Sequence, residues 1–403
     1  MNTSLLVTVT GQDRPGVSAR LLTTLGTFPL TIVDLEQVVI GDRLVLGAQL
    51  AVDERVAPGV RHDRLFAEAR DEVSKTAADL GLEVEFGDGD SDSRAPIADR
   101  LHVTLLADPL RPAALGAITS CVARGEANID RIERLANYPV TAIELTISGG
   151  DHDQLRTELA TEAATQAIDV AVQSSGLHRR SKHLIVMDVD STLIQGEVIE
   201  LLAEYAGCAE QVAGVTEEAM RGNLDFEESL RRRVALLQGL DASALDAVRD
   251  NLVLAPGART LARTLKRLGY ECAIVSGGFT QVTDKLVADL GIDYSAANTL
   301  EVVDGKLTGE LTGPIIDRPG KAAALRRFAT EAEVPLNRTV AIGDGANDLD
   351  MLATAGLGVA YNAKPVVREA ADTSVNVPYL DTIVFLLGIS REEIENADES
   401  QSL

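Results

Sequence analysis

The feature that most constrains the fold is a set of four short apolar runs in the C-terminal half of the chain. Polar or glycine-rich residues follow each run, and helical patterns lie between the runs. Strands that alternate with helices in this way form a parallel sheet with helices on both faces. The sequence therefore predicts an α/β domain with a doubly wound parallel sheet over residues 183–403. The four runs are His183–Met187, Glu271–Val275, Thr339–Ile342 and Leu357–Ala360.

A long insertion separates the first two predicted strands. The segment Glu197–Arg267 has helical periodicity and few clusters of β-branched residues. It is too long for a simple crossover. We therefore expect a helical cap at about 197–267. Farther along, Asp304-Gly305 within Val302–Leu307 is a hairpin turn signal.

Two polar stretches divide the chain into three segments. Gly87–Ala95 is rich in Gly, Asp and Ser, and Gln173–Lys182 is polar with a short basic cluster. Such stretches are typical of solvated linkers. The predicted segments are 1–86, 96–172 and 183–403.

The first two segments share a weak internal repeat at an offset of about 96 residues. Leu5–Thr10 and Leu101–Leu106 each predict a strand that leads through a turn into a helix, which covers Val17–Leu25 in the first copy. A short apolar element ending in Asp follows each helix, as Thr31–Asp34 and Asn128–Asp130. We expect a duplicated βαββαβ unit, which is an α+β module.

The first of these units resembles an ACT domain, through the strand–DRPG–helix opening at Asp13–Gly16 and the following strand with Asp34. The resemblance implies two N-terminal ferredoxin-like domains that form a homodimer and bind an amino-acid effector such as serine. The second unit departs from the pattern, because Asp108–Pro112 has no Gly after its second proline. The alternative is that both domains serve only for dimerisation.

The charge of the chain limits its partners. Lys and Arg number 37 and Asp and Glu 62, so the net charge is −25. Such acidity disfavours nucleic acid and anionic membranes. With seven Phe, six Tyr and no Trp, a base-stacking platform is also not expected.

The cysteines and the apolar stretches indicate a reducing compartment. Cys121, Cys208 and Cys272 are far apart and form neither a CxxC pair nor a zinc spacing. The N-terminus lacks the pattern of a signal peptide. The longest apolar stretch, near Ile383–Ile389, is far too short to span a membrane. We expect a cytoplasmic protein.

Chemically capable side chains follow the predicted strands. Asp188–Thr192, Ser276–Gly278 and Asp344–Asp348 each come directly after an apolar run, and Lys321 opens the helix before the third run. Each group alone would be read as a turn, a helix cap or a surface lysine. Parallel sheets bind ligands beyond the carboxyl ends of their strands, so the combination predicts one site.

The residue types suit phosphoryl transfer. Carboxylates crowded together need a cation, and oxygen ligands such as Asp188 and Asp344 favour Mg²⁺. An aspartate can attack phosphorus, and a second carboxylate two residues on can protonate the leaving alcohol and then deprotonate water. Three groups would hold the phosphoryl oxygens, namely Ser276, the Gly277 amide and Lys321.

The four motifs, in this order, resemble the haloacid dehalogenase-like phosphohydrolases, which implies a Rossmann-like catalytic domain. Within that superfamily, the strings at 188–197 and Ile342–Asp348 are similar to those of phosphoserine phosphatases. The resemblance implies hydrolysis of O-phospho-L-serine in L-serine biosynthesis, through an aspartyl-phosphate intermediate. It also implies that Asp188 is the nucleophile and Asp190 the general acid and base. The implied magnesium ligands are Asp188, the Asp190 carbonyl and Asp344, with Asp348 as a supporting carboxylate.

The same resemblance implies a set of substrate contacts. Glu197 would face the substrate amine and Arg233 the substrate carboxylate, a pair that phosphoserine requires away from its phosphate. Read alone, Arg233 lies in an Arg231–Arg233 run that is typical of a solvated helix face. The implied substrate-binding residues are Glu197, Met220, Phe226, Arg233, Ser276, Gly277, Lys321 and Asn347.

Three other functions are compatible with parts of the pattern. A related phosphatase could act on another phosphoamino acid or a small sugar phosphate. A phospho-accepting signalling protein would also use an aspartate, but Asp190 supplies a built-in group for hydrolysis. A purely amino-acid-binding regulator would need an inactive C-terminal domain, which the complete set of motifs disfavours.

Overall fold

The computed structural model describes residues 3–90, 100–175, 183–221 and 223–399. The chain divides into two compact units, Met1–Ala95 and Pro96–Leu403, and each is described by itself. Within the described ranges, no helix combines the length and the apolar character that crossing a membrane requires.

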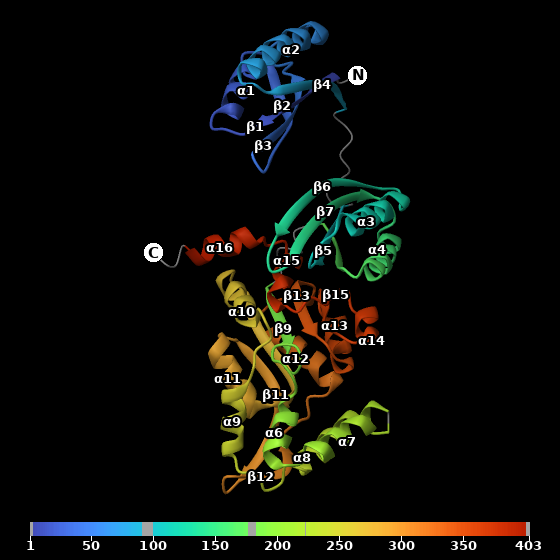
Figure 1. The fold of residues 1–403 in the computed structure, drawn as a ribbon, viewed down its shortest axis with the longest axis vertical. Helices are drawn as coiled ribbons and strands as arrows, with labels where there is room; N and C mark the ends of the chain where they lie inside the picture. Colours follow the sequence, from blue (N-terminus) through green and yellow to red (C-terminus); the bar gives the residue numbers. More distant parts are fainter. Residues whose placement is uncertain (1–2, 91–99, 176–182, 222, 400–403) are drawn as a thin grey trace. The chain divides into compact units, whose positions relative to one another are not determined.

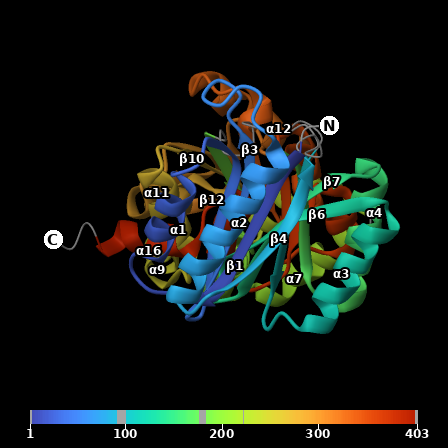
Figure 2. The same cartoon turned by 90° about the horizontal axis from the view of Figure 1, so that it is seen from above.

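The first unit is a four-stranded antiparallel sheet with two helices on one face (Figure 2). The strand order is β2-β3-β1-β4. Alternate residues of β1 and β3 point toward the helices, so that Leu5 and Leu44 pack with Leu21 and Val73 in one core. Helix α1 covers the residues that the sequence predicted. The elements are β1 (Thr3–Gln12), α1 (Val17–Leu25), β2 (Leu30–Ile40), β3 (Arg43–Val52), α2 (His62–Asp79) and β4 (Glu83–Asp90).

The second unit begins with a copy of the same module. Its strand order, β6-β7-β5-β8, repeats that of the first unit position for position. The predicted duplication of an α+β module is therefore confirmed. The elements are β5 (Arg100–Ala107), α3 (Pro112–Arg124), β6 (Ala127–Ala136), β7 (Thr141–Gly149), α4 (His152–Gln166) and β8 (Asp169–Ser174).

The rest of the second unit is built on a seven-stranded sheet of order β12-β11-β10-β9-β13-β14-β15 (Figure 1). All neighbours are parallel except β11 and β12, which form a hairpin. Its two-residue turn is the predicted Asp304-Gly305, with φ of 50° and 77°. The strands are β9 (Leu184–Asp188), β10 (Glu271–Phe279), β11 (Tyr294–Val303), β12 (Lys306–Thr312), β13 (Thr339–Gly343), β14 (Gly358–Tyr361) and β15 (Thr373–Val375).

The central strand β9 is buried on both faces. Ile185 and Met187 belong to one apolar core, and Leu184 and Val186 to another on the opposite face. The first core includes residues of α10 and α11, and the second includes residues of α12, α13 and α14. The predicted doubly wound sheet is therefore confirmed. These helices are α10 (Ala258–Arg267), α11 (Thr280–Leu290), α12 (Arg318–Glu331), α13 (Leu349–Thr354) and α14 (Pro365–Ala370).

The insertion after β9 is helical, as predicted, but the part that can act as a cap is shorter. It forms α6 (Val198–Ala206), α7 (Ala209–Met220), α8 (Phe226–Ala235) and α9 (Ser243–Asn251) before α10. Helix α10 packs against β10 and the short helix η4 (Leu380–Thr382), so it belongs to the sheet and not to the cap. The β11–β12 hairpin packs against α8.

The two predicted linkers are partly regular structure. Residues 87–90 belong to β4 and pair with β1, whereas 91–95 lie outside the described residues. Gln173 belongs to β8, and its Nε2 donates to the Leu386 carbonyl at 2.8 Å. Residues 176–182 again lie outside the described part.

The second module packs directly on the large sheet. Leu106, Ala142 and Ala171 of the module share the apolar core of β9. In addition, Thr373 Oγ1 in β15 donates to the Val170 carbonyl in β8 at 2.9 Å. The module is therefore part of the second compact unit.

Candidate active site

The predicted residues meet in a pocket of about 400 Å³ at the carboxyl ends of β9, β10 and β13. Residues of α8 and of the loop that ends at α6 form the facing wall. Of the predicted set, the pocket is lined by Asp188, Asp190, Glu197, Phe226, Arg233, Gly277, Lys321, Asp344 and Asn347. Ser276 and Asp348 lie behind this lining and bind members of it.

The floor of the pocket is a buried charge cluster. Lys321 is fully buried, and its Nζ donates to Asp188 Oδ1 at 2.6 Å and to Asp348 Oδ1 at 2.7 Å. Burial and the neighbouring Asp348 raise the pKa of Asp188 well above its ordinary value, although Lys321 opposes that shift. The ammonium of Lys321 is thus already engaged by protein groups. It fixes the orientation of Asp188 at the end of β9.

Asp348 is held at a second point as well. Its Oδ2 accepts the backbone N–H of Gly345 at 2.9 Å, while its Oδ1 faces Lys321. The side chain also fills the space beside Gly343, where a Cβ would collide with its carboxyl group. These contacts suit the supporting role expected for Asp348, because both of its oxygens are used within the protein.

Asp190 is placed by the start of α6 and by the irregular C-terminal part of β10. The Val198 backbone N–H donates to its Oδ1 at 2.8 Å, and Ser276 Oγ donates to its Oδ2 at 3.1 Å. Ser276 Oγ in turn accepts the N–H of Gly278 at 2.8 Å. Burial raises the pKa of Asp190, although both hydrogen bonds oppose this. A buried carboxyl with a raised pKa is suited to hold a proton and transfer it.

The hydroxyl of Ser276 was expected to bind phosphate. In this structure it bonds Asp190 and the Gly278 amide instead, so its geometry is that of a residue that positions the Asp190 carboxyl. Gly277 remains on the pocket wall, with the Phe226 ring beside it; a Cβ on Gly277 would lie 3.2 Å from Phe226 Cζ.

Three carboxylates crowd together on the floor of the pocket, and both oxygens of Asp348 are already bonded within the protein. Asp188, Asp344 and Asp348 each offer an oxygen within 4.8 Å of the others. Burial and the neighbouring Asp348 raise the pKa of Asp344 to about 6, and Thr192 Oγ1 donates to its Oδ1 at 3.2 Å. Repulsion of this kind is relieved by a divalent cation, and an all-oxygen donor set suits Mg²⁺. The residues therefore fit the expected metal.

The wall that faces this floor carries a second charged pair. Arg233 Nη1 lies 3.7 Å from Glu197 Oε2, and the Arg233 side chain is only 12% exposed. The Nε of Arg233 is buried and has no hydrogen-bond partner among the described residues. The two preceding arginines behave differently, because Arg231 and Arg232 pair with glutamates on the exposed face of α8. Only the third residue of the run points into the pocket.

The remaining predicted residues differ in how far they are described. Asn347 lies in the short helix η3 (Ala346–Asp348) and lines the pocket. Met220 ends α7, but its side chain lies outside the described part of the chain.

Two residues that the sequence did not single out also shape the site. Asn298 in β11 is buried; its Nδ2 donates to the Gly277 carbonyl and its Oδ1 accepts the Ile316 N–H, both at 2.8 Å. It thereby ties the C-terminal part of β10 to the loop before α12. Lys364 lines the pocket from the loop before α14. Asn298 belongs to no local pattern, whereas the position of Lys364 shortly after the fourth apolar run is a signal for a residue at the same edge of the sheet.

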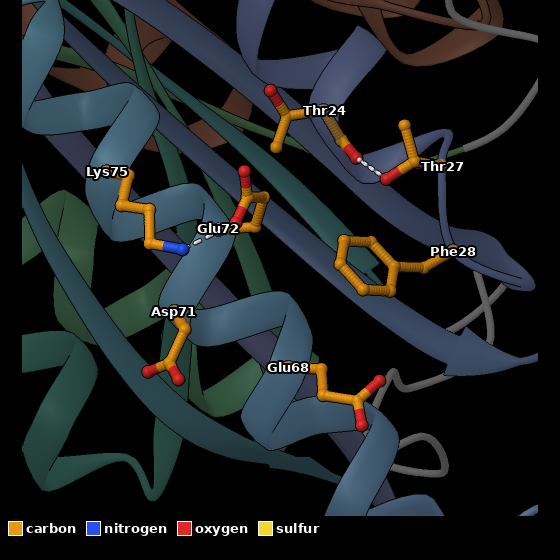
Figure 3. Close-up of a pocket in the computed structure, with 7 residues that line it drawn as sticks. All are labelled: Thr24, Thr27, Phe28, Glu68, Asp71, Glu72 and Lys75. Carbon is orange, nitrogen blue, oxygen red and sulfur yellow. Dashed lines mark hydrogen bonds and ion pairs between the residues drawn. The ribbon is translucent and has the colours of Figure 1, made fainter.

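The first unit has a hollow of its own, between the end of α1 and helix α2 (Figure 3). Its lining includes Phe28 and three carboxylates, and Lys75 Nζ is paired with Glu72 Oε2 at 2.9 Å. An acidic lining with its ammonium already paired does not suit a phosphate ester. The chemistry therefore lies in the pocket of the second unit.

Comparison with known proteins agrees with this assignment. Residues 185–353 match the haloacid dehalogenase-like hydrolase family, and residues 3–87 and 101–173 each match an ACT domain family. The chain is 58% identical to a phosphoserine phosphatase of Streptomyces coelicolor, over 98% of this chain and 94% of that protein. It is 50% identical to phosphoserine phosphatase SerB2 of Mycobacterium tuberculosis, over 98% and 95% of the two chains. Among solved structures, the unliganded probable phosphoserine phosphatase of Vibrio cholerae matches with a TM-score of 0.59 and 38% identity, covering 73% of this chain and 88% of that one.

Proposed function

This chain belongs to the phosphoserine phosphatases, haloacid dehalogenase-like hydrolases that here carry two ACT domains, and we propose that it hydrolyses O-phospho-L-serine through an aspartyl-phosphate intermediate. We further propose that the reaction supplies L-serine for biosynthesis. The observation that carries the mechanism is the placement of two carboxyls at the end of β9. Asp188 is oriented by Lys321, and Asp190 is held as a separate acid by Val198 and Ser276.

The proposed reaction has two steps. An Asp188 oxygen attacks phosphorus, and the P–O bond to serine breaks while Asp190 gives its proton to the leaving serine oxygen. Asp190 then takes a proton from water, whose oxygen attacks the phosphoryl group and releases phosphate and the Asp188 carboxylate. Bound Mg²⁺ would lower the repulsion between the phosphate and the carboxylates. Asp188, the Asp190 carbonyl and Asp344 would hold it.

Selection of phosphoserine would rest on the facing wall. A guanidinium that is nearly buried and has an unpartnered Nε can bind a planar carboxylate through two parallel hydrogen bonds. Glu197, beside Arg233, would accept hydrogen bonds from the substrate ammonium. Loss of this pair would remove the preference for phosphoserine over sugar phosphates, which have neither group.

The activity is tested by phosphate release from phosphoserine, phosphothreonine and sugar phosphates, with Mg²⁺ and with EDTA. Wild type should prefer phosphoserine and require Mg²⁺, and Asp188→Asn should be inactive. Arg233→Ala should lose the preference. Equal rates on all substrates would favour the related phosphatase of different specificity, and full turnover by Asp188→Asn would exclude the proposed nucleophile.

For the N-terminal modules we propose dimerisation and binding of serine. The support for a partner is β2, an edge strand of the first unit with several exposed apolar side chains, of which Ile40 is 71% exposed. Exposed apolar edge strands pair with other chains. Sedimentation of wild type and of Val38→Lys tests the dimer, which the variant should weaken. L-Serine should inhibit the full chain more strongly than a chain beginning at Pro96; equal inhibition would refute a role for the first module.

A further inference from the structure

Lys364 differs from the other cations of the pocket. Three cationic side chains line the pocket, and two are already engaged, Lys321 by Asp188 and Asp348 and Arg233 by Glu197. Lys364 is exposed, and none of the described residues forms an ion pair with it. Its ammonium is therefore the lining cation that is available to an incoming anion.

The backbone holds Lys364 in a fixed place while its side chain remains in solvent. The residue precedes Pro365 and has the extended conformation that proline imposes, with φ of −63° and ψ of 153°. On either side of it, Ala363 and Val367 are buried in the core beneath the sheet. The Asn362 N–H also donates to the Val375 carbonyl at 2.8 Å, which ties this loop to β15.

Lys364 has a large effect on the net charge of the pocket. Its lining holds four carboxylates, Asp188, Asp190, Glu197 and Asp344, against the three cations. With these carboxylates and Asp348, which shares Lys321, all ionised and one divalent cation bound, the site carries a net charge of about zero, and without Lys364 it would be about −1. In an open pocket, a single unpaired charge of this kind controls how strongly a dianion is attracted.

We propose that Lys364 is the phosphate-capture residue of this site: its ammonium attracts the phosphoryl group of the entering substrate and retains inorganic phosphate after hydrolysis. This inference rests on the proposed function. Lys321 lines the floor of the same pocket, but its ammonium is already paired with Asp188 and Asp348, so Lys364 is the unpaired cation of the described lining that an entering anion meets. Lys364 would act on the binding of substrate and product, and not on the chemical steps, which Asp188 and Asp190 perform.

The test compares Lys364→Gln and Lys364→Arg with Lys285→Gln, which removes the same charge from an exposed pair outside the pocket. Lys364→Gln should raise the KM for phosphoserine and the inhibition constant for inorganic phosphate by about tenfold, with kcat within about twofold. The salt dependence of kcat/KM should also become weaker, because less of the attraction remains to be screened. Lys364→Arg keeps the charge and should retain most of the wild-type affinity for phosphoserine and phosphate. Lys285→Gln should match wild type.

A KM and a phosphate inhibition constant within twofold of wild type in Lys364→Gln would overturn the proposal, as would equal changes in Lys285→Gln. Calorimetric titration with inorganic phosphate, with Mg²⁺ and with EDTA, measures the same capture without turnover. Weaker phosphate binding in Lys364→Gln than in wild type supports the proposal even if wild type does not hydrolyse phosphoserine, an outcome that would refute the proposed function alone. Unchanged binding in both conditions refutes the role of Lys364.

Discussion

The Nζ of Lys321 lies 2.6 Å from Oδ1 of Asp188, and neither side chain has appreciable contact with solvent. The same ammonium lies 2.7 Å from Asp348 Oδ1, so one cation serves two buried carboxylates that have no other cation beside them among the described ion pairs. A buried charge is costly without a partner, and removal of one partner leaves the other uncompensated. The floor of the active site therefore depends on Lys321 for stability as well as for the orientation of Asp188.

Replacement of this lysine should destabilise the fold. In Lys321→Met, with EDTA present, we expect the free energy of unfolding to fall by about 3–5 kcal/mol, because two buried carboxylates lose their counter-ion. Urea unfolding followed by circular dichroism measures this. Lys285→Met removes an exposed pair and should change stability by less than about 0.5 kcal/mol. A loss below about 1 kcal/mol in Lys321→Met would contradict the claim that Asp188 and Asp348 depend on Lys321 as their counter-ion.

The fold was predictable where local pattern and tertiary environment agree. The strands β9, β10, β13 and β14 are apolar runs buried in the sheet, so that hydrophobicity alone located them. Strand β11 was missed because its sequence, YSAANTLEVV, is largely polar and small, and its residues are mostly half-buried. Its strand conformation depends on pairing with β10 and on the hairpin with β12.

The same distinction applies to the site. Asp188, Asp190, Asp344 and Lys321 follow strands or open a helix, so their meeting could be inferred from the rule that parallel strands end together. Asn298 could not be found this way, because it joins Gly277 in β10 to a loop that is near only in the folded chain.

The role proposed for Asp190 as the general acid and base predicts a specific kinetic defect. Asp190→Asn retains an oxygen for the Val198 N–H but has no transferable proton, so kcat on phosphoserine should fall by about 10²- to 10⁴-fold. p-Nitrophenyl phosphate needs no proton on its leaving group. The variant should therefore give a rapid burst of p-nitrophenol followed by slow turnover. Equal slowing of the burst and the steady state would contradict this assignment.

Gly278 is required by the close approach of the Asp190 carboxyl. A Cβ at this position would lie 2.9 Å from Ser276 Oγ and 3.0 Å from Asp190 Oδ2. Gly278→Ala should therefore displace the acid and lower kcat/KM by about 10- to 100-fold. Gly116→Ala in α3 meets nothing within 4 Å and is the matched control, with activity equal to wild type. Wild-type kinetics in Gly278→Ala would show that the backbone at Gly278 can move to accommodate a Cβ without displacing Asp190.

The raised pKa of Asp344 predicts how metal and pH affect stability. Its pKa is about 6 in the folded protein and 3.8 as the ordinary value, so between these the folded state binds more protons than the unfolded state. Stability from this group is therefore lost as the pH rises through 6. In EDTA, we expect the Tm of wild type to fall relative to that of Asp344→Asn when the pH is raised from 5 to 7.5.

Magnesium should reverse that loss. A cation binds the deprotonated carboxylate, so Mg²⁺ should raise the Tm of wild type more at pH 7.5 than at pH 5. Asp344→Asn should respond weakly at both pH values. A response to Mg²⁺ that is the same at both pH values would argue against Asp344 as a ligand.

One buried carboxylate contributes several hydrogen bonds to the attachment of the second module to the large sheet. Asp169 in β8 is 6% exposed, and its Oδ2 accepts the backbone N–H groups of Asn376 at 2.6 Å and Val377 at 3.2 Å. Its Oδ1 accepts Asn376 Nδ2, also at 2.6 Å. Asp169→Ala would leave these donors without an acceptor at the interface. We expect a loss of about 2–4 kcal/mol, since each unsatisfied buried donor costs about 1–3 kcal/mol.

Comparison of Asp169→Asn with Asp169→Ala distinguishes the loss of the negative charge from the loss of the hydrogen bonds. Asp169→Asn keeps one acceptor oxygen in the same shape and should lose less stability than Asp169→Ala, whereas Asp153→Ala on the exposed start of α4 should lose no more than about 0.5 kcal/mol. In calorimetry, Asp169→Ala should also unfold less cooperatively, because the module and the large sheet share fewer contacts. If Asp169→Ala unfolds with the wild-type Tm and cooperativity, the apolar contacts of the module and the hydrogen bonds of Thr373 and Gln173 hold it in place without Asp169.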